Sequence, residues 1–117
     1  MPELKIKRVY EHPDKSDGFR ILVDRLWPRG IKKEMAQVDI WMKEVAPSTA
    51  LRKWFNHDPA KWEAFIKKYT LELKGSESAG ELIDVIHKHP KVTLLYSAHD
   101  EQHNQAQVLY LFLKNKL

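Results

Sequence analysis

Cysteine is absent from the 117 residues, and glycine is scarce, with four residues at positions 18, 30, 75 and 80. The lack of cysteine excludes disulfide bonds, thiolate metal ligands and a cysteine nucleophile. The four glycines are too scattered for a dinucleotide-binding fingerprint or a phosphate-binding P-loop. These absences exclude the standard nucleotide-binding motifs, but they leave open an anion site built from arginine side chains.

Long apolar runs and a strong excess of one charge are also missing. No run approaches the length of a membrane-spanning helix, and the N-terminal residues lack the apolar core of a signal peptide. We therefore expect a cytoplasmic protein with no membrane contact. The net charge of +4 arises from 20 basic and 16 acidic residues. This charge favours an anionic small molecule as partner and leaves a nucleic acid possible, although the chain lacks the basic stripe of a dedicated nucleic-acid-binding protein.

The apolar pattern is typical of one small α/β domain that spans residues 1–117. Strands are expected where short β-rich apolar runs end at polar or turn-forming residues. The last of these runs is apolar throughout, which indicates a central strand. Because strands alternate with helical segments, the sequence predicts a small mixed or mostly parallel sheet of about four strands, packed by helices. The expected strands cover residues 4–10, 19–24, 38–43 and 92–96.

Capping residues mark the starts of the expected helices. Ser48 is placed as an N-cap, and Asp58 followed by Pro59 opens the helix with the clearest apolar stripe. A capping box at residues 78–81 predicts the start of the next helix. Two further helices are expected, at residues 32–36 and from residue 106 to the C-terminus.

The segment 24–30, Asp-Arg-Leu-Trp-Pro-Arg-Gly, directly follows a buried apolar run and is the most distinctive motif of the chain. Pro28 fixes its own φ and keeps Trp27 out of the helical region, while the final glycine lets the chain leave the turn. We therefore expect a stiff loop that holds Arg25 and Arg29 in defined directions. Because arginine suits planar, bidentate recognition of carboxylate or phosphate groups, the loop is interpreted as one wall of an anion-binding site.

Polar side chains follow three of the expected strands. If the strands are parallel, their carboxyl ends share one edge of the sheet, where ligands bind in open α/β folds. Helix starts at this edge would offer backbone N–H groups to an anion. The candidates for ligand binding are Arg25, Arg29, Lys43, Ser48, Arg52, Tyr96 and Asn104, and the candidates for proton transfer are Asp24, Asp100 and His57.

Each candidate also has an ordinary structural interpretation. The two arginines of the loop can pair with Asp24 or hold loop carbonyls. Lys43 and Arg52 can be solvated surface residues, and Ser48 can be a plain N-cap. The aspartate after His57 is needed as a helix cap, which competes with a catalytic His–Asp pair. The spacing of the remaining histidines does not make a metal site without cysteine, so we expect neither a metal nor a cofactor.

Four motifs in a fixed order carry a family resemblance. They are Asp-Arg-Leu-Trp-Pro-Arg-Gly at 24–30, Trp-x-Lys-x-x-Ala-Pro-Ser at 41–48, Leu-Arg-x-Trp-Phe-x-His-Asp-Pro at 51–59 and Thr-Leu-Leu-Tyr-x-Ala at 93–98. With them the chain resembles, over nearly its whole length, the YeaO-like branch of the domain of unknown function, family 488. The resemblance implies a bacterial or archaeal single-domain protein and brings no established activity with it.

The chain departs from the broader family after the last expected strand. The broader family has a Cys-Ala-Glu pattern there, followed by a Cys-His-Arg pattern, whereas this sequence has Tyr-Ser-Ala at 96–98 and Asn-Gln-Ala at 104–106. Any thiol or metal chemistry of the wider family therefore does not carry over to this chain.

Three hypotheses for the function follow from these patterns. The first is an enzyme or ligand-binding domain with an arginine-rich pocket for a phosphorylated small molecule or nucleotide. The second is a non-catalytic nucleic-acid-binding module, and the third is a protein-interaction domain in which the arginine, tryptophan and aspartate cluster is architectural. The balanced charge favours the first over the second. The sequence does not choose between the first and the third, and it leaves enzymatic activity and oligomeric state open.

Overall fold

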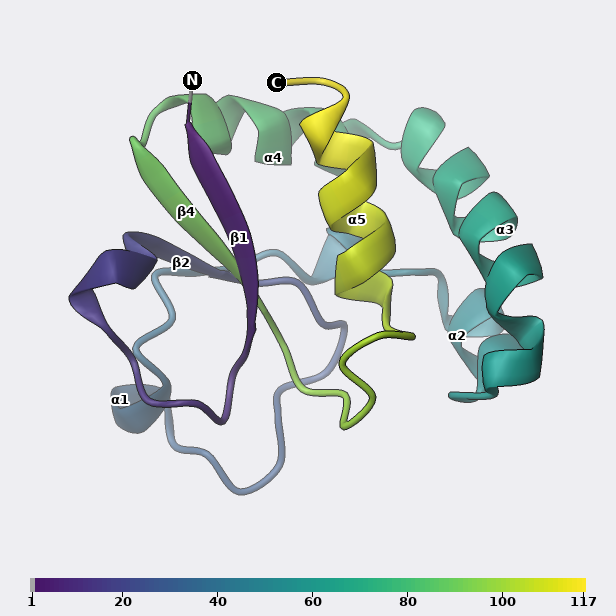
Figure 1. Ribbon diagram of the computed structural model, residues 1–117, viewed down its shortest axis with the longest axis horizontal. Helices are drawn as coiled ribbons and strands as arrows, with labels where there is room; N and C mark the ends of the chain where they lie inside the picture. Colours follow the sequence, from purple (N-terminus) through teal and green to yellow (C-terminus); the bar gives the residue numbers. More distant parts are fainter. Residues whose placement is uncertain (1) are drawn as a thin grey trace.

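The computed structural model describes residues 2–117, which form one four-stranded sheet and five α-helices (Figure 1). Every strand pairing is parallel. The expected α/β class with a mostly parallel sheet is therefore confirmed, and the last strand is central as its apolar run predicts. The strands are β1 (Glu3–Arg8), β2 (Phe19–Leu22), β3 (Ile40–Trp41) and β4 (Lys91–Tyr96), in the spatial order β1-β4-β2-β3.

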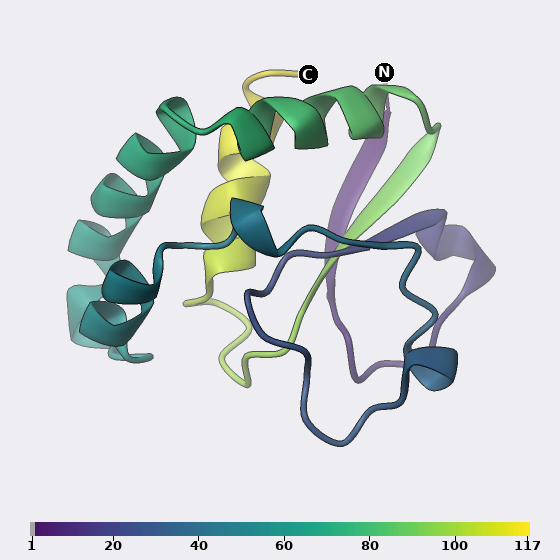
Figure 2. The ribbon, with the colours of Figure 1, turned by 180° about the vertical axis from the view of Figure 1, so that it is seen from behind.

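The helices divide unequally between the two sides of the sheet. Helices α2 to α5 lie on one side, and the short helix α1 lies on the other (Figure 1, Figure 2). Helix α5 packs directly against β1 and β4, α3 packs against α5, and α2 packs against α3. The helices are α1 (Lys33–Ala36), α2 (Thr49–Phe55), α3 (Trp62–Lys74), α4 (Glu77–His87) and α5 (Gln105–Lys114).

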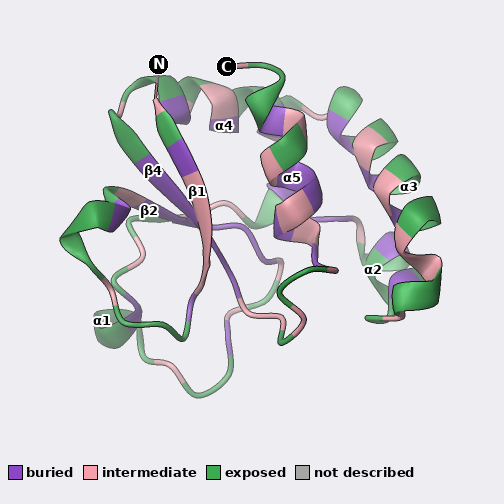
Figure 3. Ribbon diagram, viewed as in Figure 1, coloured by how far each residue is buried: buried purple, intermediate pink, exposed green. Residues whose placement is uncertain are grey.

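Side chains on the strands alternate between two apolar cores. Ile21 and Leu94 belong to the main core beneath α2 to α5, whereas Leu22 and Leu95 belong to a smaller core on the opposite face. All four side chains are fully buried, and each contributes about 1.5–3 kcal/mol through removal of apolar surface from water. Figure 3 shows the burial along the central strand β4. The alternation explains why β2 and β4 read as continuous apolar runs in the sequence.

Local sequence signals place the elements to within a few residues, but several boundaries differ. Strand β3 has only two residues because the chain turns into a 3-10 helix directly after it, at Lys43–Val45. The capping-box prediction is wrong: Ser76, not Ser78, is the N-cap of α4, and its hydroxyl accepts a hydrogen bond from the Ala79 N–H at 3.2 Å. The cap predicted at Ser48 is confirmed. Asp58 is a cap, but it opens a short 3-10 helix, Pro59–Lys61, and α3 itself begins only at Trp62.

A buried ionic cluster lies on the face of the sheet that carries the smaller core. Its centre is Asp17, which is only 1% exposed and is contacted by the Lys7 ammonium at 3.1 Å, by Lys5 at 3.5 Å and by the Arg20 guanidinium. Burial alone would raise the pKa of Asp17. The hydrogen bond from the Asp14 backbone N–H and the bonds from Lys7 and Arg20 outweigh that effect, so the pKa is lowered. Asp17 therefore remains a charged carboxylate that joins β1 to β2.

Candidate functional site

The loop after β2 is held in place by three hydrogen bonds from aromatic side chains. The Trp41 indole N–H donates to the Asp24 carbonyl oxygen at 2.7 Å, and the Trp27 indole donates to a carbonyl of the same loop at 2.8 Å. The Tyr10 hydroxyl donates to the Arg29 carbonyl oxygen at 2.8 Å. The glycine that ends the motif has a φ of 76°, which it reaches without a Cβ clash. The loop thus has a defined path past the carboxyl edge of the sheet.

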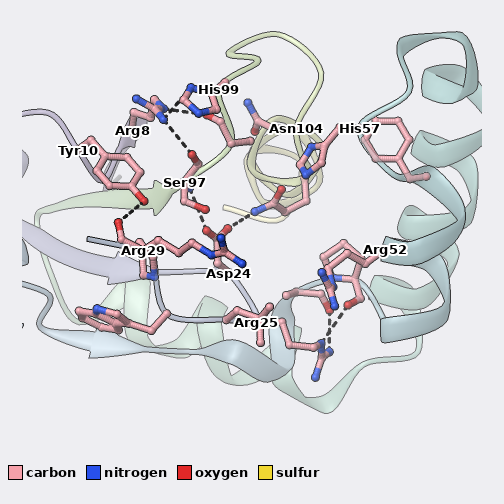
Figure 4. A pocket seen from close by; sticks show the side chains of 18 of the residues that line it. Arg8, Tyr10, Asp24, Arg25, Arg29, Arg52, His57, Ser97, His99 and Asn104 are labelled. Carbon is pink, nitrogen blue, oxygen red and sulfur yellow. Dashed lines mark hydrogen bonds between the residues drawn. The ribbon is translucent and has the colours of Figure 1, made fainter. Parts of the chain in front are cut away.

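A pocket of about 690 Å³ opens at this edge, between the loop, the turn after β4 and the residues around α2 and α5 (Figure 4). The volume lies within the range of roughly 300–1,000 Å³ that is usual for small-molecule sites. Arginine, aromatic and histidine side chains surround one buried carboxylate. Six of the residues predicted from the sequence line the pocket, and they are Asp24, Arg25, Arg29, Arg52, His57 and Asn104.

Asp24 is the buried acidic group of the pocket, with 8% of its surface exposed. Its Oδ2 accepts a hydrogen bond from the Ser97 backbone N–H at 2.9 Å, and its Oδ1 accepts one from the Gln105 side-chain amide. Both donors are neutral, and within residues 2–117 no basic side chain forms a salt bridge with this carboxylate. Burial raises the pKa of Asp24, and the bonds from Ser97 and Gln105 only partly oppose the shift.

Two arginines of the pocket are already engaged by the protein. The Arg25 guanidinium donates to the carbonyl oxygens of Pro47 and Ala46, both at 3.2 Å. This bonding is the structural role that the sequence left open for the arginines of the loop. Arg8, at the end of β1, donates to two carbonyl oxygens in the turn after β4, at 2.9 and 3.2 Å. These two side chains build the walls of the pocket.

The other two arginines point toward the pocket from different elements. Arg29 comes from the loop after β2, and Arg52 comes from α2 (Figure 4). Both side chains are exposed, and neither guanidinium has a hydrogen-bond or salt-bridge partner in the described part of the chain. A guanidinium offers five N–H donors in a fixed plane. Their donors are therefore available to a molecule in the pocket.

The wall beside α2 contains two successive residues in the left-handed region. Asn56 ends the helix with a φ of 46°, and His57 follows with a φ of 54°. Left-handed backbone is common for asparagine after a helix, but for histidine it costs about 1–2 kcal/mol. The preceding Phe55 is buried and stacks on Phe65 at 4.2 Å between ring centres. This packing anchors the strained turn, and strain of this kind is concentrated at functional sites.

Four predicted candidates lie outside the pocket lining. Lys43 is exposed and lies 5.2 Å from the centre of a tryptophan ring, and Tyr96 is buried in the main core. The carboxylate of Asp100 accepts hydrogen bonds within its own turn. The backbone N–H and hydroxyl of Ser48 donate to the Glu72 carboxylate at 2.9 and 2.6 Å. The N-terminus of α2 therefore binds a carboxylate, but one that belongs to the protein itself.

Sequence reasoning missed several lining residues, among them Arg8, Tyr10 and Gln105. A signal for Arg8 and Tyr10 was present, because both lie near the end of the first expected strand, residues 4–10, but only the other three strand ends were compared. Gln105 has no signal of its own. Its role depends on the approach of α5 to the end of β2, and the sequence does not specify that approach.

The remaining histidines are engaged separately. His99 lies 3.2 Å from the Arg8 guanidinium, and His103 lies 2.9 Å from the Asp100 carboxylate. Within residues 2–117 no three His, Asp or Glu side chains form a group that could hold a metal ion. In that same range no helix has both the length and the apolar character needed to cross a membrane.

Comparisons with known proteins give the family of the chain. An uncharacterized protein of Escherichia coli (strain K12), YeaO, is 46% identical over 112 residues, which cover 96% of this chain and 97% of that protein. An uncharacterized protein of Mycobacterium tuberculosis (strain ATCC 25618 / H37Rv), Rv3073c, is 47% identical over 79 residues, or 68% of this chain and 67% of that protein. No solved structure matches the chain. The family described as the Inactive DUF488-N3 subclade matches residues 3–117, and the chain belongs to it. The YeaO-like resemblance is therefore confirmed.

Proposed function

We propose that this member of the Inactive DUF488-N3 subclade is a binding protein for an anionic small molecule, which it holds at the carboxyl edge of its sheet. One observation carries the proposal. Arg29 and Arg52 reach the same pocket from separate elements, and their guanidiniums have no acceptor within residues 2–117. Planar guanidiniums recognise carboxylate and phosphate groups through paired hydrogen bonds, so the pair forms a clamp for such a group.

The arrangement supports binding rather than catalysis. The family description itself carries the word inactive. Of the three candidates for proton transfer, Asp100 is bonded to His103 outside the pocket lining, and Asp24 already accepts bonds from Ser97 and Gln105. His57 lines the pocket, but no nucleophile is paired with it. A site of this kind holds a ligand without a group positioned to attack it.

The pocket favours a small molecule over a nucleic acid. Nucleic-acid binding without sequence preference relies on a positively charged groove that follows the phosphate backbone. Here the arginines line a single pocket of about 690 Å³, together with aromatic side chains and the Asp24 carboxylate. A compact anionic ligand fits this description, and its binding should depend on individual arginines rather than on the net charge.

The test is a thermal-unfolding titration with phosphate and sulfate, compared with chloride at matched ionic strength. A ligand that binds only the folded state raises stability by RT ln(1 + [L]/Kd). We expect a saturable rise for phosphate or sulfate that is lost in Arg29→Gln and in Arg52→Gln. Lys53→Gln is the matched control, since Lys53 is an exposed cation of α2 that does not line the pocket. A flat response to both oxyanions, or an equal loss in Lys53→Gln, would contradict the proposal.

A further inference from the structure

The unusual group in the pocket is the carboxylate of Asp24, because it is buried without a cation. Arg25 follows it directly in the chain, yet its guanidinium is bonded to the carbonyl oxygens of Ala46 and Pro47. Arg29 and Arg52 form no salt bridge with Asp24 within residues 2–117. A buried negative charge normally has a paired cation or a full set of hydrogen bonds. Asp24 has neither within the described chain.

The unused bonding capacity of Asp24 can be counted. Each carboxylate oxygen accepts about two hydrogen bonds. Oδ2 accepts one from the Ser97 N–H, and Oδ1 accepts one from Gln105. The Ser97 hydroxyl also lies beside this carboxylate and lowers its pKa, but these three donors do not use all of its acceptor positions. Asp24 also lines the pocket, where Figure 4 shows it at the centre of the cluster. Because a serine hydroxyl can rotate to another acceptor, the two oxygens of this carboxylate can receive a pair of parallel N–H donors from a ligand.

We infer that the ligand carries, besides its anionic group, a planar amidine-type pair of N–H donors that binds Asp24, and that it is a guanine mononucleotide. This inference rests on the proposed anion site of Arg29 and Arg52. Guanine offers two adjacent N–H donors on one edge of a flat ring, and its phosphate supplies the anion. The stacked rings of Phe55 and Phe65 give the pocket an apolar side of the kind against which such a ring packs.

Two further observations agree with this assignment. Burial raises the pKa of Asp24, which means that the protein alone compensates its charge poorly, and a donor pair from a ligand would supply the missing stabilisation. The bonds from Ser97 and Gln105 also fix the carboxylate in one orientation before a ligand arrives. An acceptor held in this way favours a ligand with matching donors and disfavours one with a carbonyl oxygen at the same position.

The experiment is calorimetric titration of the full chain with GMP, IMP and XMP. The three nucleotides share the same phosphate, but IMP lacks the 2-amino donor and XMP replaces it with a carbonyl oxygen. We expect GMP to bind about tenfold to hundredfold more tightly than IMP, the discrimination typical of a paired-donor contact, and XMP to bind most weakly. In Asp24→Asn the preference for GMP over IMP should disappear, because the amide offers one acceptor oxygen and one NH2 group in place of two acceptor oxygens.

The comparison between nucleotides needs no variant, so it remains decisive even if Asp24→Asn fails to fold. Equal affinities for GMP and IMP would overturn the inference, and so would a preference for GMP that persists in a folded Asp24→Asn. A third outcome separates the two claims. If inorganic phosphate and IMP bind only when Arg29 is present, and GMP binds no more tightly than IMP, the inference fails and the anion site stands. If none of these compounds binds, both the inference and the proposed function fail.

Discussion

Two buried aspartates, seven positions apart in the chain, have opposite electrostatic environments. Asp17 is contacted by Lys5, Lys7 and Arg20, and its pKa is lowered. Asp24 is bonded only to neutral donors, and its pKa is raised. Both side chains are nearly inaccessible, with 1% and 8% of their surface exposed. The degree of burial alone therefore does not distinguish a structural carboxylate from one available to a ligand.

The partners of each carboxylate make that distinction. The Arg20 guanidinium, besides its contact with Asp17, donates to the carbonyl oxygens of Gln37 and Ala36 at 3.0 and 2.9 Å. Each of the three guanidinium nitrogens thus has an acceptor, and the group ties β2 to the segment before β3. At Asp24 the neighbouring Arg25 turns away to other carbonyls, which leaves the negative charge facing a pocket. The first arrangement joins two strands through an ionic cluster, and the second leaves a carboxylate with only neutral hydrogen-bond donors.

The largest loss of stability is expected from a substitution at Asp17, the carboxylate of the ionic cluster. Asp17→Asn removes the charge that compensates Arg20 and Lys7 and leaves the buried guanidinium without its anion. Loss of one partner of a buried ion pair costs about 3–5 kcal/mol, so the urea-unfolding midpoint should fall sharply at neutral pH. Because the pKa of Asp17 is lowered in the folded state, its contribution is present above the unfolded pKa and is lost in acid. A loss below about 1 kcal/mol would show that the cluster is not structural.

The second effect concerns the arginine beside the pocket carboxylate. Arg25→Met removes the donors to Ala46 and Pro47, and we expect a loss of about 1–2 kcal/mol in the free energy of unfolding. Arg29→Met is the matched control, since this exposed guanidinium has no partner within residues 2–117, and its change should stay within about 0.5 kcal/mol. Equal losses in urea unfolding of the two variants would mean that both arginines are structural.

A smaller effect of opposite sign is expected at the pocket itself. Asp24→Asn removes a buried charge that has no cation, and the new amide can still accept from the Ser97 N–H. We expect its stability at neutral pH to equal the wild-type value or exceed it by up to about 1 kcal/mol. A raised pKa means that the wild type loses stability as the pH rises from the unfolded value of about 3.9 through the folded value. The advantage of the variant should therefore vanish in acid, as urea unfolding at several pH values would measure.

The Asp17→Asn variant is the control for the stability predicted for Asp24→Asn. Asp17→Asn and Asp24→Asn remove the same charge from the same small protein, so any general effect of net charge is shared. A loss of stability in Asp17→Asn and an unchanged or raised stability in Asp24→Asn at neutral pH would confirm that the two carboxylates differ. A loss of several kcal/mol at both positions would instead show that the bonds from Ser97 and Gln105 make Asp24 a structural residue.

The smallest effect is expected at the rim of the ionic cluster. Lys5 lies 3.5 Å from the Asp17 carboxylate, but 38% of its side chain is exposed. An exposed ion pair is screened by water and contributes little, so Lys5→Met should change the free energy of unfolding by less than about 1 kcal/mol. Lys7→Met, at a site where only 16% of the side chain is exposed, should cost more in the same urea titration. If Lys5→Met lowers the free energy of unfolding as much as Lys7→Met does, then the exposed Lys5 is also an energetic part of the cluster.

Patterns of neighbouring residues predict the elements of this fold well. The apolar runs at β2 and β4 and the cap at Ser48 depend on local physics, and they are found where expected. Asp58 caps a 3-10 helix that precedes α3 instead of α3 itself. The capping box at Ser78 failed because Ser76, two residues earlier, satisfies the same need for an N–H acceptor. Such near-equivalent signals can be separated only by the packing of the whole helix.

The candidate site is less predictable because it depends on distant contacts. Parallel strands bring Asp24, Arg29 and Arg52 to one pocket, as strand-end reasoning expected. The sequence does not reveal that the Arg25 guanidinium turns toward Ala46, or that Gln105 reaches Asp24 from 81 positions away. Such partners are chosen by tertiary packing. Residue types therefore identified several side chains that line the pocket, but not which of them the protein itself engages.

The order of the strands also has a consequence for the synthesis of the protein. Strand β4 lies between β1 and β2, and both of them pair with it rather than with each other. A nascent chain that ends before residue 91 therefore has its first strands without a partner at the centre of the sheet. Their apolar faces stay uncovered on the ribosome until the last quarter of the chain emerges. We therefore expect the central pairings of the sheet to form only late in synthesis, and the unfinished chain to be the form most exposed to aggregation.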